Sequence, residues 1–329
     1  MSEGRRRLQK VLGAASAKMI AKNNIYRGDC REVLKLFDVE SVDHVISDIP
    51  YGIAYSEWDV IHGNTNSALL GSSPAQDKAG SIFRTRGKPL NGWSEADKRI
   101  PMEYYTWCKT WTELLFSIVK PGSSVLIFAG RRLAHRAICA FEDSGFTFRD
   151  MIAWNKEKAA HRAQHISVVY ERRNDIKNAK KWEGWKVGNL RPLFEPILWF
   201  MKPYRIGGTI ADNVLEYSTG AYNENIIARY GQTCSNYISF DSKKDDKGLH
   251  PTQKPLSLMR FLIELVSVKG QVILDPFAGS GTTLLACKQL ERDYIGIEQN
   301  DEYYNSAKNR LELDCWHCGD TGNGVQLFC

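Results

Sequence analysis

The chain has 329 residues, of which 43% are hydrophobic and 25% charged, values that are typical of a soluble globular protein and that exclude a collagen-like or disordered chain. With no apolar run of about 18 residues and no apolar signal core behind the basic N-terminal residues, the sequence argues against a membrane or secreted protein and predicts a cytoplasmic one. The net charge of +6 is a weak indication of an anionic partner.

The predicted elements alternate between strand and helix after a basic lead-in, which indicates an α/β fold with a doubly wound, mostly parallel sheet. We expect strands at 24–29, 42–48, 123–130, 146–156, 195–203, 271–275 and 292–298. We expect helices at 30–37, 104–122, 131–145, 256–268, 282–290 and 301–313. Polar stretches at 56–102, 157–190 and 204–249 interrupt this pattern, and the last of them is predicted to be irregular.

One of these interruptions carries the excess positive charge. Residues 156–191 contain ten Lys or Arg and four acids, together with Tyr170, Trp182 and Trp185. Basic residues mixed with aromatic ones suit phosphate contacts and base stacking, although a solvated surface loop with a helix would have a similar composition. The candidate nucleic-acid contacts are Arg172, Arg173, Lys180, Lys181 and Lys186, with Arg84, Arg86 and Lys88 as weaker ones.

A glycine-rich turn follows the predicted strand at 271–275, in the sequence VILDPFAGSGTT. Glycines let the backbone approach a ligand, and the following helix would present unpaired N–H groups at Thr282. The turn is neither a phosphate-binding P-loop nor G-x-G-x-x-G, and alone it would suit any tight strand-to-helix turn. Glu298, about 20 residues later at the end of the next strand, suits the hydroxyls of a ribose, so the pair indicates a nucleoside cofactor.

The stretch SDIPYG at 47–52 ends an apolar strand with an acid, a proline and a tyrosine. Alone, it would be read as a strand-end turn with an Asp cap. It stands, however, in an ordered set with GDC (28–30), HPTQKP (250–255) and DPFAGSGTT (275–283). This set resembles the amino-group DNA methyltransferases, in which DIPY is a variant of the catalytic D-P-P-Y motif. The catalytic motif precedes the cofactor motif, as in the permuted beta class.

The resemblance implies the cofactor S-adenosylmethionine and a partner, double-stranded DNA, whose target base is flipped out. By the same resemblance Asp48, Pro50 and Tyr51 would hold the base. The cofactor would be bound by Asp29, Thr252, Lys254, Asp275, Phe277, Gly279, Gly281, Thr282 and Glu298. Asp29 would contact the cofactor's adenine, Glu298 its ribose, and Thr252 to Lys254 would lie beside its carboxylate.

The family mostly uses Asp at the first catalytic position for adenine and Ser for cytosine, so Asp48 favours methylation of the adenine 6-amino group. Ser47 lies one position too early and is not counted as the Ser variant. A cytosine 4-amino enzyme, a non-catalytic DNA-binding relative and an RNA or small-molecule methyltransferase remain the alternatives. No membrane partner is expected, and the sequence leaves monomer and homodimer open.

This reading divides the chain into five parts: a lead-in at 1–22, a catalytic half at 23–203, a target-recognition region at 204–249, a cofactor-binding half at 250–313 and a tail at 314–329. The catalytic half includes the insertions 56–102 and 157–190. In the tail, Cys315, Cys318 and Cys329 make up half a zinc site at most. A tail with reduced thiols is the preferred interpretation, with bound zinc as the alternative.

Overall fold

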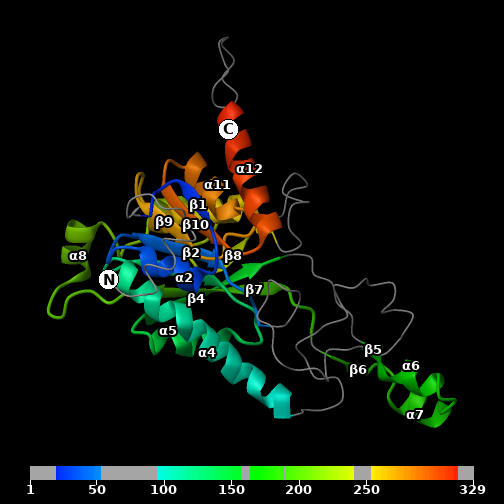
Figure 1. Cartoon of the computed structure of the whole chain (residues 1–329). Coiled ribbons are helices and arrows are strands. Elements are labelled where there is room, and N and C mark those ends of the chain that lie inside the picture. The colour runs from blue at the N-terminus through cyan, green and yellow to red at the C-terminus, as the bar shows by residue number, and fades with distance from the viewer. Residues whose placement is uncertain (1–19, 53–94, 157–163, 189, 241–252, 318–329) are drawn as a thin grey trace.

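The computed structural model describes residues 20–52, 95–156, 164–188, 190–240 and 253–317. In the helix that begins at residue 95, side chains are described from Lys98 onward, and in the last helix they are described up to Leu313. In this part of the chain a single eight-stranded sheet forms the centre of the molecule (Figure 1). Its order is β1 (Asn24–Arg27), β10 (Asp293–Glu298), β9 (Val272–Asp275), β2 (His44–Asp48), β3 (Ser124–Phe128), β7 (Phe194–Met201), β4 (Thr147–Asn155) and β8 (Tyr237–Ser239).

The sheet is mostly parallel, as predicted. The strands from β1 to β3 all run in the same direction, and β8 is parallel to β4. Only β7 runs against both of its neighbours, β3 and β4. Strands from both predicted halves of the chain contribute to this one sheet, because β9 and β10 lie between β1 and β2.

Helices cover both faces of the sheet, because alternate residues of a strand point to opposite sides. Val45 and Ile127 join a buried cluster with α2 (Cys30–Val33), the short helix η1 (Leu34–Leu36), α4 (Glu95–Ile118) and α5 (Ala134–Glu142). Ile46 and Leu126 join a second cluster with α9 (Glu224–Arg229), α10 (Leu256–Val266), α11 (Thr282–Gln289) and α12 (Asp301–His317). The protein is therefore a three-layer α/β structure of the predicted class.

Two helices are longer than predicted. Helix α4 begins at Glu95, nine residues before the predicted start at Tyr104, and contains Pro101. Pro101 is the seventh residue of this helix, and a proline inside a helix removes a backbone hydrogen bond and crowds the preceding turn; the helix nevertheless continues through it here. Helix α12 continues to His317, beyond the predicted end at Leu313.

The prediction of an irregular region at 204–249 is wrong for the part that is described. It contains α8 (Ile210–Tyr217), which begins with a reciprocal capping box between Thr209 and Asp212, and it contributes α9 and β8 to the main body. Helices α8 and α9 are only eight and six residues long, too short for an apolar periodicity to stand out from the polar residues around them.

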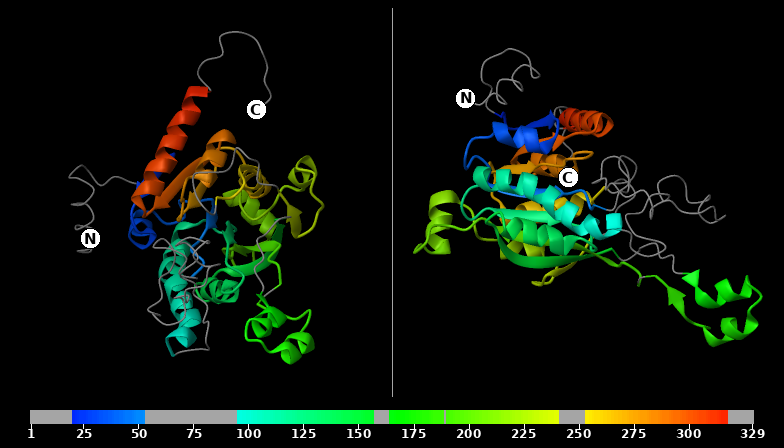
Figure 2. Two further views of the ribbon diagram at one scale, coloured as in Figure 1. Left: turned by 90° about the vertical axis from the view of Figure 1, so that its right-hand side faces the viewer. Right: turned by 60° about the horizontal axis from the view of Figure 1, so that its bottom comes forward.

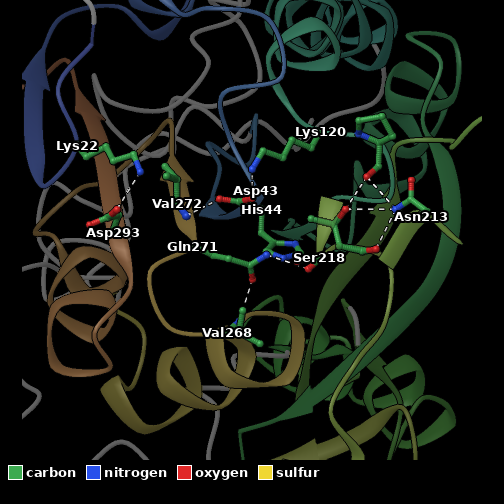
Figure 3. A network of polar contacts seen from close by, with 12 residues as sticks. Lys22, Asp43, His44, Lys120, Asn213, Ser218, Val268, Gln271, Val272 and Asp293 are labelled. Carbon is green, nitrogen blue, oxygen red and sulfur yellow. Dashed lines mark hydrogen bonds and ion pairs between the residues drawn. The ribbon is translucent and has the colours of Figure 1, made fainter. Parts of the chain in front are cut away.

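This region is hydrogen-bonded to the end of the sheet at which β2 and β9 begin (Figure 3). Asn213 donates hydrogen bonds to the carbonyls of Pro121 (3.1 Å) and Thr219 (2.9 Å), and Gln271 donates one to Ser218 (2.9 Å). Beside them Asp43 accepts from Lys120 at 2.6 Å. These buried bonds fix the segment after β7 against the start of the central strands.

The basic segment 164–187 forms a small unit of its own, which we call the basic arm. It consists of β5 (Gln164–His165), α6 (Ile166–Glu171), α7 (Ile176–Lys181) and β6 (Lys186–Val187), with β5 and β6 antiparallel. In both Figure 1 and Figure 2 the arm stands away from the sheet, beyond β4 and β7. Among the helices of the described residues, none combines the length and apolar character that crossing a membrane requires.

Candidate active site

The two predicted motif strands, β2 and β9, are direct neighbours in the sheet. They pair in parallel, with His44 opposite Ile273 and Val45 opposite Leu274. Their carboxyl ends, Asp48 and Asp275, therefore lie at the same edge of the sheet. A cavity of about 730 Å³ opens at this edge, where the ends of β1, β2, β9 and β10 meet. Such an edge of a doubly wound sheet is the usual place for a ligand.

Most of the predicted site residues line this cavity. They are Asp29, Asp48, Pro50, Tyr51, Lys254, Asp275, Phe277, Gly279, Thr282 and Glu298. Gly281 is not part of the lining, and Thr252 lies outside the described residues. Motifs that are more than 200 residues apart in the sequence thus converge on one cavity.

The glycines of the turn have different roles. Gly279 has φ +52°, and a Cβ placed on it would meet no protein atom within 4 Å. Gly281 has φ +79°, and its Cβ would lie 2.9 Å from the Cβ of Ala307 in α12. Gly279 therefore leaves space in the cavity wall, whereas Gly281 allows α12 to pack closely against the turn. Next to it, Arg310 donates a 2.9 Å hydrogen bond to the Thr282 hydroxyl.

Glu298 holds the turn from the neighbouring strand. Its carboxylate accepts hydrogen bonds from the backbone N–H groups of Gly279 (2.8 Å) and Asn300 (2.7 Å). Burial raises the pKa of Glu298 above its ordinary value, against the effect of these hydrogen bonds. A fixed carboxylate in a cavity wall is suited to accept hydrogen bonds from a diol.

Asp29, at the other side of the cavity, begins α2. Its carboxylate accepts from the backbone N–H of Arg31 at 2.9 Å and pairs with the Arg31 guanidinium. The pKa of Asp29 is lowered, because the hydrogen bonds from Arg31 outweigh the effect of burial. The carboxylate lines the cavity and stays ionised.

Asp275 is fully buried at the end of β9. It accepts a 2.6 Å hydrogen bond from the Ser47 hydroxyl and a 3.1 Å bond from the Phe277 N–H. Burial raises the pKa of Asp275 to about 6, and the hydrogen bond from Ser47 acts in the opposite direction. Ser47, which was not counted among the site residues, thus positions an acid of the cavity. Its position one residue before the catalytic motif gives no sign of this contact.

The DIPY turn is fixed from two sides. Ile49, which replaces a proline of the family motif, is only 1% exposed and packs in the core below the turn. The hydroxyl of Tyr104, a buried residue of α4, donates a 2.8 Å hydrogen bond to the Pro50 carbonyl. The packing of Ile49 in the core and the hydrogen bond from Tyr104 thus make this turn rigid, although Ile49 lacks the proline ring of the family motif.

Asp48 and Tyr51 belong to a compact group of charges. Lys254 lies 2.5 Å from one Asp48 oxygen and 3.1 Å from the Tyr51 hydroxyl, which in turn lies 3.0 Å from the other Asp48 oxygen. Glu195, at the start of β7, contacts the Tyr51 hydroxyl, Lys156 and Lys254. Burial lowers the pKa of Lys156 to about 8. The structure thus places Lys254, expected beside a cofactor carboxylate, against Asp48, the predicted catalytic acid.

Sequence reasoning missed Glu195, Lys156 and Trp107. Glu195 and Lys156 merely flank predicted strands, where a charged residue is common, so nothing in the sequence distinguished them. Trp107 is part of the cavity lining and stands beside Phe277, with ring centroids 5.6 Å apart. Its spacing in an amphipathic helix indicated only a core position.

The predicted nucleic-acid contacts lie on the basic arm and not in the cavity. They are the exposed side chains of Arg172, Arg173, Lys180, Lys181 and Lys186. Trp182 and Trp185 pack edge to face on the same unit, with centroids 5.4 Å apart. Arg84, Arg86 and Lys88 lie outside the described residues.

Of the three C-terminal cysteines, Cys318 and Cys329 lie outside the described residues, and only the backbone of Cys315 is described, in α12. Among the side chains that are described, no group of three or more His, Cys, Asp or Glu is placed to hold a metal ion.

Comparisons with known proteins agree with this arrangement. Residues 42–309 match the family model of the DNA methylases, N6_N4_Mtase. The chain is 54% identical over 299 residues to the type II methyltransferase M.HindIII of Haemophilus influenzae, covering 89% of this chain and 96% of that protein. It is 26% identical to M.HinfI of the same species over 88% of this chain and 68% of that protein.

Solved structures share the fold. The PvuII cytosine-N4-specific DNA methyltransferase superposes with a TM-score of 0.57 at 16% identity, covering 89% of this chain and 88% of that one. A DNA modification methylase from Thermus thermophilus, solved with S-adenosylmethionine, has a TM-score of 0.54 at 19% identity, covering 88% and 93%. The family model and the extent of the M.HindIII match show that this chain belongs to the DNA methylase family.

Proposed function

We propose that this protein is an adenine-specific DNA methyltransferase of the permuted beta class. It transfers the methyl group of S-adenosylmethionine to the 6-amino group of adenine in double-stranded DNA. The observation that carries the proposal is the meeting of the Asp48 turn and the glycine turn at adjacent strand ends, around one cavity.

The residues present fit the cofactor. The cavity has the volume of a small-molecule site, and the left-handed backbone at Gly279 leaves its wall open. Glu298 would hold the ribose hydroxyls and Asp29 the adenine amine, while Phe277 and Asp275 line the part nearest to Asp48. When bound there, S-adenosylmethionine supplies an electrophilic methyl group on its positively charged sulfur.

The catalytic turn has acceptors for the target amine. An exocyclic amine is a poor nucleophile, because its lone pair is delocalised into the base. The Asp48 carboxylate and a backbone carbonyl of the turn would accept its two hydrogens and favour a tetrahedral nitrogen. The Pro50 carbonyl of this turn already accepts one hydrogen bond, from Tyr104, which holds it in place. After methylation the nitrogen carries one excess proton, which Asp48 is placed to accept.

Two features concern the choice and delivery of the base. Asp at the first motif position favours adenine, and the cytosine 4-amino enzyme remains the alternative. Tyr51 would stack on the base once it has left the duplex. The basic arm and the region 204–249 would contact the surrounding DNA, the arm through phosphates and the edge-to-face tryptophans.

Purified protein incubated with DNA and methyl-labelled S-adenosylmethionine tests the proposal. We expect label in the DNA and, after digestion to nucleosides, 6-methyladenine. Recovery of only 4-methylcytosine would replace adenine with cytosine as the target. DNA that stays unlabelled while RNA is labelled would point to the RNA alternative, and no transfer at all to the non-catalytic one.

The variant Asp48→Ala tests the division of roles. Cofactor affinity should be retained, because Asp48 only borders the cofactor region, whereas methyl transfer should be lost. Equal loss of both would contradict this assignment.

A further inference from the structure

Glu195 is a buried acid at the edge of the catalytic turn that the proposed chemistry does not use. Its side chain is 8% exposed and is not part of the cavity lining. It reaches this edge because β7 is antiparallel, so the beginning of β7 lies beside the end of β3, with Phe128 opposite Ile197. Its carboxylate contacts Tyr51, Lys156 and Lys254.

Tyr51 has one hydroxyl hydrogen and two carboxylates within reach. The hydroxyl lies 3.0 Å from Asp48 Oδ1 and is closer still to Glu195 Oε1. A single O–H donates one full hydrogen bond, so it cannot serve both carboxylates fully. Glu195 therefore competes with Asp48 for this hydrogen.

Lys254 is shared in the same way. Its ammonium lies 2.5 Å from Asp48 Oδ2 and 3.1 Å from Glu195 Oε1. Lys156 contacts the second oxygen of Glu195, so the group contains two acids and two lysines. Without Glu195, Lys254 and the Tyr51 hydroxyl would each lose one carboxylate partner and keep their contact with Asp48.

On the basis of the proposed function, we propose that Glu195 is a positioning residue for methyl transfer. It takes the Tyr51 hydroxyl hydrogen and shares the Lys254 ammonium, so that the Asp48 carboxylate is available to accept the target amine. Lys156 acts through Glu195, by balancing its charge.

The substitution Glu195→Gln keeps the side-chain shape and removes the charge. We expect the single-turnover rate at saturating DNA and cofactor to fall about tenfold or more. The reason is that the contacts of Glu195 with Tyr51 and Lys254 lose the strength that the charged carboxylate gives them. The dissociation constants for S-adenosylmethionine and DNA should stay within about twofold of the wild-type values, because Glu195 does not line the cavity. A purely structural acid would not give this separation of rate from binding.

Glu264→Gln is the matched control. Glu264 is a similarly buried acid of α10 that accepts from a tyrosine hydroxyl, Tyr230 at 2.6 Å, and pairs with Arg229. It is not part of the cavity lining. Glu264→Gln should lower the thermal stability by about as much as Glu195→Gln does. It should leave the single-turnover rate of the folded protein unchanged.

A double-mutant cycle tests the role of Lys156. If Lys156 acts through Glu195, Lys156→Met in the Glu195→Gln background should change the rate less than in the wild type. Wild-type protein that labels DNA, together with a Glu195→Gln rate within about twofold of it, would overturn the inference and leave the proposed function standing. Wild-type protein that labels no nucleic acid would instead refute the proposed function.

Discussion

The buried carboxylate of Asp275 should make the folded protein less stable at neutral pH. Its pKa is about 6 in the folded protein and about 3.8 when unfolded, because burial opposes the charge. Between these values the folded state holds a proton that the unfolded state has lost, so stability falls as the pH rises from about 4 to 6. A difference of about two pKa units corresponds to about 3 kcal/mol at neutral pH.

The substitution Asp275→Asn removes this titration. We expect the free energy of unfolding of the variant, measured relative to wild type, to increase by about 2.4 kcal/mol between pH 4 and pH 7, because only the wild type loses stability in this range. Urea unfolding of the cofactor-free proteins at several pH values in this range measures the difference. The variant should also bind S-adenosylmethionine more weakly, because Asp275 lines the cavity.

His44 provides a control of opposite sign. It is fully buried, and burial lowers its pKa from 6.5 to about 4. Here the unfolded state binds the proton first as the pH falls, so stability is lost on going down from about pH 6.5 to pH 4. His44→Asn keeps an acceptor for the Ser124 N–H, which donates to Nδ1 at 3.1 Å, and should remove this slope. Differences from wild type that stay constant with pH for both variants would refute the reasoning.

Other predictions concern single contacts. Tyr104→Phe should reduce the free energy of unfolding by about 1–3 kcal/mol, because the Pro50 carbonyl loses its hydrogen-bond donor. It should also slow methyl transfer and leave cofactor affinity unchanged. An unchanged single-turnover rate would contradict the role of Tyr104 in holding the turn. Gly281→Ala should destabilise by about 1–3 kcal/mol in urea unfolding, since the new Cβ meets Ala307 in a left-handed backbone. The matched variant Gly279→Ala places its Cβ in open space and should mainly weaken cofactor binding, as measured by titration. Equal losses of cofactor affinity in the two variants would contradict the different roles assigned to Gly279 and Gly281.

The sequence predicted the parts of this site that lie in local motifs. The apolar strands that end at Asp48 and Asp275 could be predicted from their periodicity, and the resemblance to the methyltransferases implied that both ends belong to one site; their direct pairing is seen only in the structure. The fold class followed from the same alternation.

Contacts between distant elements could not be predicted in this way. Ser47 reaches Asp275 and Tyr104 reaches Pro50 only because of the strand order and the packing of α4, which no local pattern contains. Glu195 was missed because no local pattern shows that β7 runs antiparallel to β3. The helices of 204–240 were missed because they are only eight and six residues long and lie among polar residues.

The antiparallel direction of β7 has a consequence for how target specificity can change between relatives. Strands β4 and β7 are paired from Thr147–Met201 to Asn155–Phe194, so they form one long hairpin whose connection carries the basic arm. Both ends of the connection leave the sheet at adjacent positions, where the Lys156 N–H bonds to the Leu193 carbonyl at 2.7 Å. A connection with such closely spaced ends can be exchanged for one of another length without shifting the register of any strand. The hairpin is thus a point of attachment at which the arm, our proposed DNA contact, could be replaced by another segment without moving the strands that carry Asp48 and Asp275.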